Sequence, residues 1–303
     1  MLDARVETFL TVCRTLNYTH AARELNLTQS AVSQHMACLE RTYGAPLTRM
    51  EGKSMRLTEE GVLLKRAFQS FSHDEALLKR RIARAADDDA IRLNVGTTLT
   101  AGEYIVAPAL ARYLAASPRV HVSVVSRSTA ELLDLMERGA IDCAFVEGFF
   151  DAASFSADRL CEQELVCVAA PGHRLAGASA CAMEDLFEEP LIVREKESGS
   201  RAVLEHALRR RNLALSSFSR VVEVSSIGII KSFVEAGLGV SFVYEAAVAC
   251  ELGEKSLARI EVRGEPIVHD ISFVRPRGSV FEDDFAMLFE GVRDEFERRG
   301  FGA

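Results

Sequence analysis

One short segment carries uncharged hydrogen-bonding side chains on a single helical face. If Val32, Met36 and Leu39 form the buried stripe of a helix, the opposite face carries Gln29, Ser30, Ser33 and Gln34. Amide and hydroxyl groups both donate and accept hydrogen bonds, as reading base edges in the major groove of DNA requires. The spacing therefore predicts a base-contacting helix. A solvated face on an ordinary helical bundle fits the same periodicity.

Basic residues surround a short hairpin expected just downstream. Two strands are predicted at residues 49–50 and 55–57, on either side of a tight turn. Arg49, Lys53 and Arg56 lie on or beside this hairpin, where they would meet phosphates or the minor groove. The hairpin is thus expected to support the helix in binding a duplex.

A second kind of site is indicated by four hydroxyl-rich junctions, each after a predicted strand. They are Gly96–Thr100, Ser126–Thr129, Glu197–Arg201 and Ser225-Ser226. A helix N-terminus offers unpaired N–H groups and a partial positive charge, so several such ends around one cleft bind a small anion. Each junction alone is equally an ordinary helix cap. Their repetition in an α/β chain favours a ligand site, because such sheets bind ligands at the carboxyl ends of their strands.

The sequence carries no pattern typical of an enzyme. His173 and His269 are isolated, and no zinc-protease, nucleophile-elbow or Walker motif occurs. The seven Cys are scattered without a C-x-x-C pair, as in reduced cytoplasmic proteins, with a redox-sensing thiol as the alternative. We therefore expect no catalysis, no cofactor and no metal.

Charge is distributed unevenly along the 303 residues. The net charge is −8, yet residues 1–58 hold seven Lys and Arg against five Asp and Glu, which leaves −10 on the remainder. A mildly basic head on an acidic body fits a DNA-reading segment followed by a segment with another task. No signal peptide and no apolar run of about 20 residues is present, so we expect a cytoplasmic, nucleoid-associated protein with no membrane partner.

Apolar spacing predicts the helices that must position the DNA-reading residues. They are expected from about Asp3 to Leu16, from Thr19 to Leu25 and from Thr28 to Tyr43. Thr19 and Thr28 are the expected N-caps, and Gly44 is the expected terminator of the third helix.

A long helix is predicted to follow, from a Thr58 cap to about Ala86. Its apolar residues keep a coiled-coil-like spacing, namely Leu64, Phe68, Phe71, Leu78 and Ile82. This row needs a cover, either a second copy of the chain or the chain's own first helix. The acidic run Asp87–Asp89 is the expected hinge and domain boundary.

Beyond the hinge, short β-rich runs alternate with helical patterns. The expected strands are 91–95, 120–125, 141–146, 165–169, 191–193, 221–224, 240–243 and 271–274. The expected helices are 104–114, 131–138, 201–211 and 227–236. Such alternation indicates parallel α/β sheets, and about 210 residues suggest two small lobes.

The first 61 residues resemble the DNA-binding domain of LysR-type transcriptional regulators. The resemblance is carried by Ala21-Ala22, Leu25, Thr28-Gln29, Ala31-Val32-Ser33, Leu39-Glu40, Gly44, Leu47, Arg49, Leu57-Thr58 and Gly61. Ser30 departs from the usual Pro and Thr48 from a common Phe. The resemblance implies a winged helix-turn-helix over residues 1–58 whose DNA contacts are Gln29, Ser30, Ser33, Gln34 and Arg49. The basic hairpin adds Lys53 to the expected contacts.

The remainder resembles the effector domain of the same family. The motifs are "VGTTLTAGEYIVAPALARYL", "GAIDCAFVEG", "REKESGSRAVLE" and "VEAGLGVSFV". They imply an α+β chain in which a linker and dimerisation helix (59–90) joins the winged domain to a two-lobed fold like type 2 periplasmic binding proteins (91–303). Lobe I would comprise residues 91–161 and 268–303, and lobe II residues 162–267.

The same resemblance implies an effector held between the lobes. Its contacts would be Thr97, Thr98, Thr129, Glu147, Ser200, Arg201 and Ser226, although Arg201 could instead pair with Glu205 one turn on. "VEG" and "SGSR" resemble the branch of sulfur-assimilation and carbon-fixation regulators. We therefore expect a small oxyanion such as sulfite, or a short organic acid, to modulate promoter binding by a homodimer or homotetramer.

Overall fold

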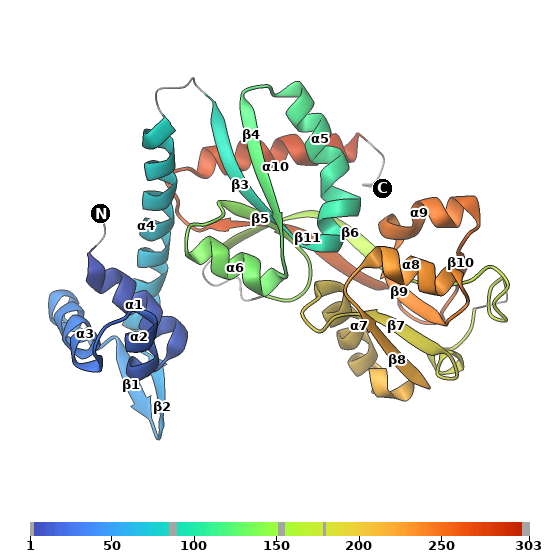
Figure 1. Ribbon diagram of the computed structural model, residues 1–303, viewed down its shortest axis with the longest axis horizontal. Helices are drawn as coiled ribbons and strands as arrows, with labels where there is room; N and C mark the ends of the chain where they lie inside the picture. Colours follow the sequence, from blue (N-terminus) through green and yellow to red (C-terminus); the bar gives the residue numbers. More distant parts are fainter. Residues whose placement is uncertain (1–2, 85–89, 151–154, 178–179, 299–303) are drawn as a thin grey trace. The chain divides into compact units, whose positions relative to one another are not determined.

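The computed structural model describes residues 3–84, 90–150, 155–177 and 180–298 (Figure 1). The chain divides into two compact units. The first comprises residues 1–88, 135–140 and 276–282, and the second comprises 89–134, 141–275 and 283–303. The predicted hinge Asp87–Asp89 lies outside the described residues. Within the described ranges, no helix combines the length and apolar character needed to cross a membrane.

The first unit begins with the predicted helices, hairpin and long helix. They are α1 (Ala4–Thr15), α2 (Tyr18–Glu24), α3 (Gln29–Tyr43), β1 (Thr48–Glu51), β2 (Ser54–Leu57) and α4 (Glu59–Arg84). Thr28 caps α3 by accepting from the Ala31 N–H at 3.1 Å, and Gly44 ends it with a φ of 69°. The Thr58 hydroxyl accepts from the Gly61 N–H at 2.9 Å and so caps α4, as expected.

One predicted cap is wrong. Helix α2 is capped by Asn17, whose Oδ1 accepts from the N–H groups of Thr19 and His20 at 2.9 and 3.1 Å. The helix therefore starts at Tyr18, and Thr19 lies inside its first turn. Asn and Thr are both common N-caps, so residue type did not distinguish the two positions.

The row of apolar residues on α4 is covered over only part of its length. Leu64 and Phe68 are buried in the core formed with α1 and α3, where the rings of Phe9 and Phe68 meet edge to face at 5.7 Å. The chain's own first helix thus covers this part of the row, which was one of the two alternatives. Further along, Phe71, Leu78 and Ile82 are 55%, 47% and 66% exposed.

The second half of α4 is held by two loops of the same unit. The Val280 N–H donates to Asp74 Oδ2 at 2.9 Å, and the Ser279 hydroxyl donates to the same carboxylate. On the other side, Arg80 Nη1 donates to the Gly139 carbonyl at 2.6 Å. These loops follow β11 and α6, so α4 is hydrogen-bonded to the ends of two elements of the α/β part of the chain.

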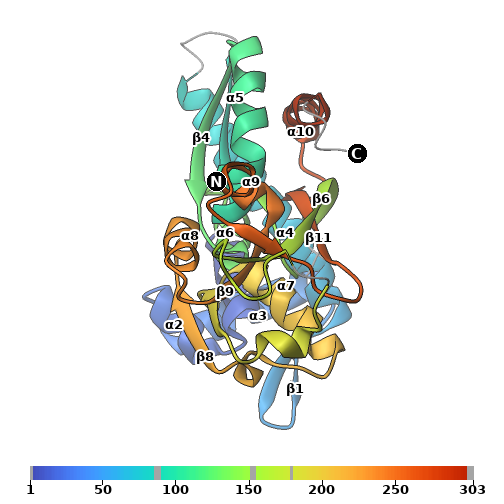
Figure 2. The same ribbon diagram turned by 90° about the vertical axis from the view of Figure 1, so that its right-hand side faces the viewer.

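The second unit is built on a mixed sheet of order β4-β3-β5-β11-β6-β9-β7-β8, with β10 pairing with β6 (Figure 1). The neighbouring strands β6 and β11 can also be followed in Figure 2. Its strands are β3 (Ile91–Thr97), β4 (Val120–Ser126), β5 (Cys143–Val146), β6 (Phe155–Ala169), β7 (Pro190–Arg194), β8 (Arg220–Val224), β9 (Val240–Tyr244), β10 (Ala258–Ile260) and β11 (Ile267–Pro276). Its helices are η1 (Ala101–Val106), α5 (Ala107–Ala116), α6 (Thr129–Glu137), η3 (Met183–Leu186), α7 (Gly199–Arg210), η4 (Leu215–Ser217), α8 (Ile227–Glu235), α9 (Glu245–Glu254) and α10 (Glu282–Glu297).

This sheet has two parallel parts joined by two connecting strands. Strands β3, β4 and β5 pair in parallel, as do β7, β8 and β9. Strand β11 pairs antiparallel with β5, and β6 pairs antiparallel with β9. The two parallel parts are the two lobes expected from the alternating pattern, here called the first lobe (β3–β5) and the second lobe (β7–β9).

Several elements differ from the sequence predictions. Strand β6 extends from Phe155 to Ala169, whereas only its last five residues, 165–169, were expected. Half-buried and exposed residues alternate over 156–159, as in a strand whose two faces differ in exposure. Strand β10 and helices α9 and α10 were not predicted. The helix expected from Tyr104 begins earlier, as a π-helical turn over Ala101–Val106 that continues into α5.

Candidate functional site

The outer face of α3 presents the predicted DNA-reading side chains. Gln29, Ser30 and Gln34 are exposed and Ser33 is half-buried, while Val32, Met36 and Leu39 are buried on the opposite face. The Ser30 and Thr28 hydroxyls are hydrogen-bonded to each other at 2.9 Å at the start of the helix. The helix N-terminus therefore carries exposed amide and hydroxyl groups, as base-edge recognition requires.

The β1–β2 hairpin places its basic residues on an exposed loop. Gly52 takes a φ of 63° in the two-residue turn, and Lys53 beside it is exposed. Arg49 pairs with Glu51 at 2.7 Å, and Arg56 approaches the same carboxylate at 3.6 Å. Exposed ion pairs contribute only about 0–1 kcal/mol, so both guanidinium groups can exchange Glu51 for a phosphate at little cost.

The second candidate site lies where strand ends of the two lobes meet. Because β3, β4 and β5 are parallel, Thr97, Thr98, Thr129 and Glu147 follow their carboxyl ends at one edge of the first lobe. Because β7, β8 and β9 are parallel, Arg194, Ser226 and Tyr244 lie at the carboxyl ends of the second lobe. Such edges are where open α/β sheets bind ligands.

Glu147 contacts residues of both lobes where their strand ends meet. Its carbonyl accepts from the Thr129 hydroxyl at 2.7 Å within the first lobe. A Cβ built on Gly199, the first residue of α7 in the second lobe, would lie 2.6 Å from Glu147 Cγ. The first turn of α7 therefore packs directly against this side chain. Gly148, with a φ of 86°, likewise lies against the Gly199 backbone, so only glycine fits at the contact.

The carboxyl of Glu147 is buried without full compensation. The residue is 2% exposed, and its Oε2 atom has no hydrogen-bond partner. Burial raises the pKa of Glu147 to about 7. Arg194, the Ser200 N–H and the Tyr244 hydroxyl oppose this rise because they favour the ionised form.

A buried hydroxyl at the end of β3 also lacks a partner. Thr98 is 3% exposed, yet its Oγ1 makes no hydrogen bond. Tyr244 is completely buried, and its hydroxyl faces the Glu147 carboxyl. An unpaired buried polar group costs about 1–3 kcal/mol. Thr98 Oγ1 and Glu147 Oε2 are thus two buried polar atoms at the carboxyl-end edge of the first lobe that a ligand could pair.

The remaining predicted effector residues are differently engaged. The Thr97 hydroxyl donates to the Thr98 carbonyl at 3.1 Å, and the Ser200 and Ser198 hydroxyls are 3.0 Å apart. Ser226 is half-buried at the start of α8, and its side chain makes no capping hydrogen bond. The structure thus brings Thr129, Glu147 and Ser200 together. Thr97, Thr98 and Ser226 share only the strand edges with them.

Arg201 makes the alternative pairing foreseen from the sequence. Its Nε donates to Glu205 at 2.8 Å, and its Nη1 donates to Glu223 and to the Arg194 carbonyl at 2.5 and 2.9 Å. These contacts fasten α7 to β7 and β8. The Nε and Nη1 atoms of Arg201 are thus paired within the protein.

Sequence reasoning missed two residues of the site, Arg194 and Tyr244. Arg194 is 6% exposed, donates to Thr100 of the first lobe at 3.0 Å and pairs with Glu195 through two hydrogen bonds. Arg194 is the last residue of the buried strand β7, and Tyr244 is the last residue of the buried strand β9. A search for polar side chains at strand ends, in addition to helix starts, would have found both.

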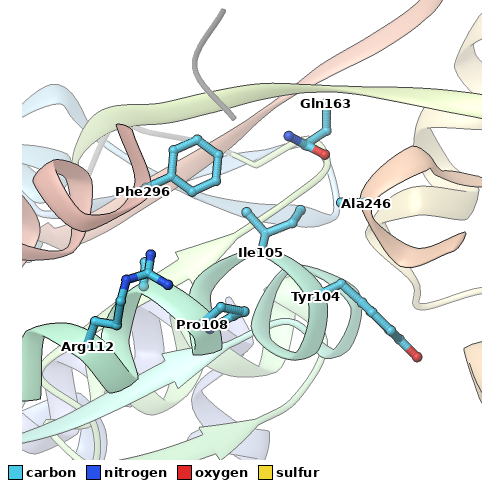
Figure 3. A pocket seen from close by; sticks show the side chains of 8 residues that line it. Tyr104, Ile105, Pro108, Arg112, Gln163, Ala246 and Phe296 are labelled. Carbon is cyan, nitrogen blue, oxygen red and sulfur yellow. The ribbon is translucent and has the colours of Figure 1, made fainter. Parts of the chain in front are cut away.

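A separate pocket lies beside the connecting strand β6. Its lining residues are Tyr104, Ile105, Pro108, Ala109, Arg112, Gln163, Ala246 and Phe296 (Figure 3). Arg112 is paired with Glu295 at 3.1 Å, and none of the predicted effector residues belongs to this lining. The pocket is thus distinct from the polar cluster around Glu147.

The buried cysteines have the character of inert thiols. All seven are free, and five of them are buried. Burial raises the pKa of Cys13 to about 12 and that of Cys161 to about 11. Because the thiolate is the reactive form, these two groups are poor candidates for redox sensing.

Comparison with known proteins matches both parts of the chain to family models. Residues 4–62 match "Bacterial regulatory helix-turn-helix protein, lysR family", and residues 86–296 match "LysR substrate binding domain". The regulator CysL of Bacillus subtilis is 28% identical over 272 residues, covering 89% of each chain. The transcriptional activator CmpR of Synechocystis is 30% identical over 263 residues, covering 86% of this chain and 84% of CmpR.

The fold of the second unit also matches a solved structure. The regulatory domain of CcmR from Synechocystis, in complex with 2-PG, superposes with a TM-score of 0.59 at 23% identity. The match covers 67% of this chain and 97% of that domain. At this identity the likeness concerns the fold.

Proposed function

Because this chain belongs to the LysR family of bacterial transcriptional regulators, we propose that it reads promoter DNA with α3 and the β1–β2 wing under the control of a small anion. The family consists of DNA-binding regulators with an effector domain, not of enzymes. The similarity to CysL and CmpR supports the proposal that the chain belongs to the sulfur-assimilation and carbon-fixation branch that its motifs indicated.

The proposed DNA contacts are Gln29, Ser30, Ser33 and Gln34 on α3, with Arg49 and Lys53 on the hairpin. The observation that carries this proposal is the exposed, uncharged polar face of α3 opposite a fully buried apolar face. Amides and hydroxyls read base edges, whereas the basic hairpin residues neutralise phosphates irrespective of sequence.

The proposed effector contacts are Thr97, Thr98, Thr129, Glu147, Ser200 and Ser226, with Arg201 holding α7 in place. Support comes from the unpaired buried atoms of Thr98 and Glu147, and from the packing of Glu147 against the first residue of α7. The structural likeness to CcmR in complex with 2-PG supports a small anion as the ligand class. A small oxyanion or a short organic acid has the acceptors to match hydroxyl and N–H donors.

We propose the division into a winged domain (1–58), a linker helix with hinge (59–90) and an effector domain (91–303). In the last, lobe I would hold residues 91–161 and 268–303, and lobe II residues 162–267. The exposed apolar residues Phe71, Leu78 and Ile82 on α4 support a homodimer or homotetramer through this helix. The proposed place of action is the cytoplasm, at the nucleoid.

The proposed mechanism is a population shift. An effector that binds the closed lobes more tightly favours that state, and the change reaches the DNA-binding heads. Helix α6 offers a route, since it starts at Thr129 beside Glu147 and the loop after it accepts a hydrogen bond from Arg80 of α4.

A gel-shift assay with the DNA upstream of the protein's own gene tests the proposal. We expect a specific complex that resists competitor DNA and whose stability changes when a bound anion is added. An anion screen by thermal shift identifies the binder, because a ligand of the native state raises the unfolding temperature. If the protein binds the upstream DNA no more tightly than DNA of random sequence, the regulator function is contradicted.

A further inference from the structure

We propose that the effector site binds its anion together with one proton, which Glu147 accepts. This inference rests on the proposed function, because it concerns the same site, and it adds a constraint on the ligand. The usable effector is an oxyanion whose affinity rises as the pH falls towards the value at which Glu147 becomes neutral.

The position of Glu147 is the first argument. The first turn of α7 is the part of this site suited to an anion, because its N–H groups lack intrahelical partners. In this chain the first turn of α7 faces the carboxylate of Glu147. Gly199 contacts the Glu147 side chain, and the Ser200 N–H favours its ionised form. An arriving oxyanion thus meets a resident negative charge.

The cationic groups near Glu147 are already paired, so they do not neutralise the charge of an additional anion. Arg194 approaches from β7, but its guanidinium is already paired with Glu195 and bonded to Thr100. Arg201 on α7 is committed to Glu205 and Glu223. From β9 the site receives only the neutral Tyr244 hydroxyl, and from β11 His269 hydrogen-bonds the Gly148 carbonyl at 3.0 Å. From α6 comes the Thr129 hydroxyl.

Protonation resolves this conflict. Neutral Glu147 no longer repels the ligand, and its carboxyl becomes a donor in place of an acceptor. The Oε2 atom is buried and lacks a partner, so a protonated carboxyl can donate a hydrogen bond to a ligand oxygen. The unpaired Thr98 hydroxyl supplies another donor. The proton comes from solvent and remains on Glu147 while the anion is bound. Burial already brings the pKa of Glu147 to about 7, so this step needs no extreme pH.

The experiment uses the full chain with sulfate and glycolate, two anions whose charge is constant between pH 6 and pH 8.5. Binding is measured by isothermal titration for the wild type, for Glu147→Gln and for Glu188→Gln, a control at an exposed glutamate in the second lobe. Uptake of one proton by a group with a pKa near 7 predicts that Kd of the wild type and the control rises roughly 15-fold from pH 7.0 to pH 8.5. Glu147→Gln, which is permanently neutral, is expected to keep one Kd throughout.

A second measurement needs no variant. Titrations of the wild type at pH 8 in two buffers with different ionisation heats report the number of protons taken up per anion, which we expect to be close to one. Binding with a constant Kd and no proton uptake would overturn the inference while leaving the anion site intact. Failure of both anions to bind either the wild type or Glu147→Gln at any pH would overturn the anion site as well.

Discussion

Replacing Glu147 by Gln should stabilise the protein at alkaline pH, although it alters a buried polar residue. The ordinary carboxyl pKa of 4.5 rises to about 7 in the folded chain. The folded state therefore binds this proton more tightly than the unfolded state, and unfolding releases it between those two pH values. Stability contributed by this group is highest below pH 4.5, falls as the pH rises through about 7 and is constant above that.

The size of the effect follows from the same two values. One pH unit corresponds to about 1.4 kcal/mol, so ionised Glu147 lowers the free energy of unfolding by about 3 kcal/mol at pH 8 and by less than about 1 kcal/mol at pH 5. Gln is neutral at both. For a domain of about 200 residues the alkaline difference corresponds to an unfolding temperature roughly 6–12 °C higher in Glu147→Gln than in the wild type.

The assay is thermal unfolding of the full chain at pH 5 and pH 8, without ligand. The informative quantity is how the difference between Glu147→Gln and the wild type changes with pH, because an altered packing contact is independent of pH. Glu188→Gln, at a side chain 85% exposed, is the control and should match the wild type at both pH values. The reasoning about burial is wrong if the difference is the same at pH 5 and pH 8.

Three further predictions concern the other sites. Gln29→Ala should weaken specific DNA binding by about 1–3 kcal/mol in a gel shift and leave binding to random DNA unchanged, because no charge is lost; an unaltered operator affinity would refute the base contact. Thr98→Val removes a buried hydroxyl that has no protein partner, so stability should hold while effector affinity falls in a titration, and equal affinity would exclude Thr98 from the site. Phe71→Glu places a charge in the exposed row of α4 and should weaken self-association in sedimentation experiments, whereas an unchanged oligomer would show that this row lies outside the interface.

The sequence determined the local structure of the DNA-reading part almost completely. Helix α3, its Thr28 cap and its Gly44 terminator depend on neighbours three or four residues apart, which a periodic pattern records directly. The alternation of strands and helices likewise predicted a two-lobed α/β architecture. Short sequence motifs in both parts of the chain carried the family resemblance. The motifs also identified most of the residues around Glu147, but they did not show which of these residues lie close together.

Only the tertiary structure decided which of those residues share a site, and how far each is buried and paired. Leu64, Phe68 and Phe71 have equivalent spacing, yet α1 covers the first two and leaves the third exposed. Arg194 and Tyr244 join the site because parallel pairing aligns strand ends that are 50 residues apart in the chain. The burial of Glu147 arises from α7, whose first residue is 52 positions away. Burial and charge compensation depend on such distant contacts, and a single sequence records periodicity but not which strands pair.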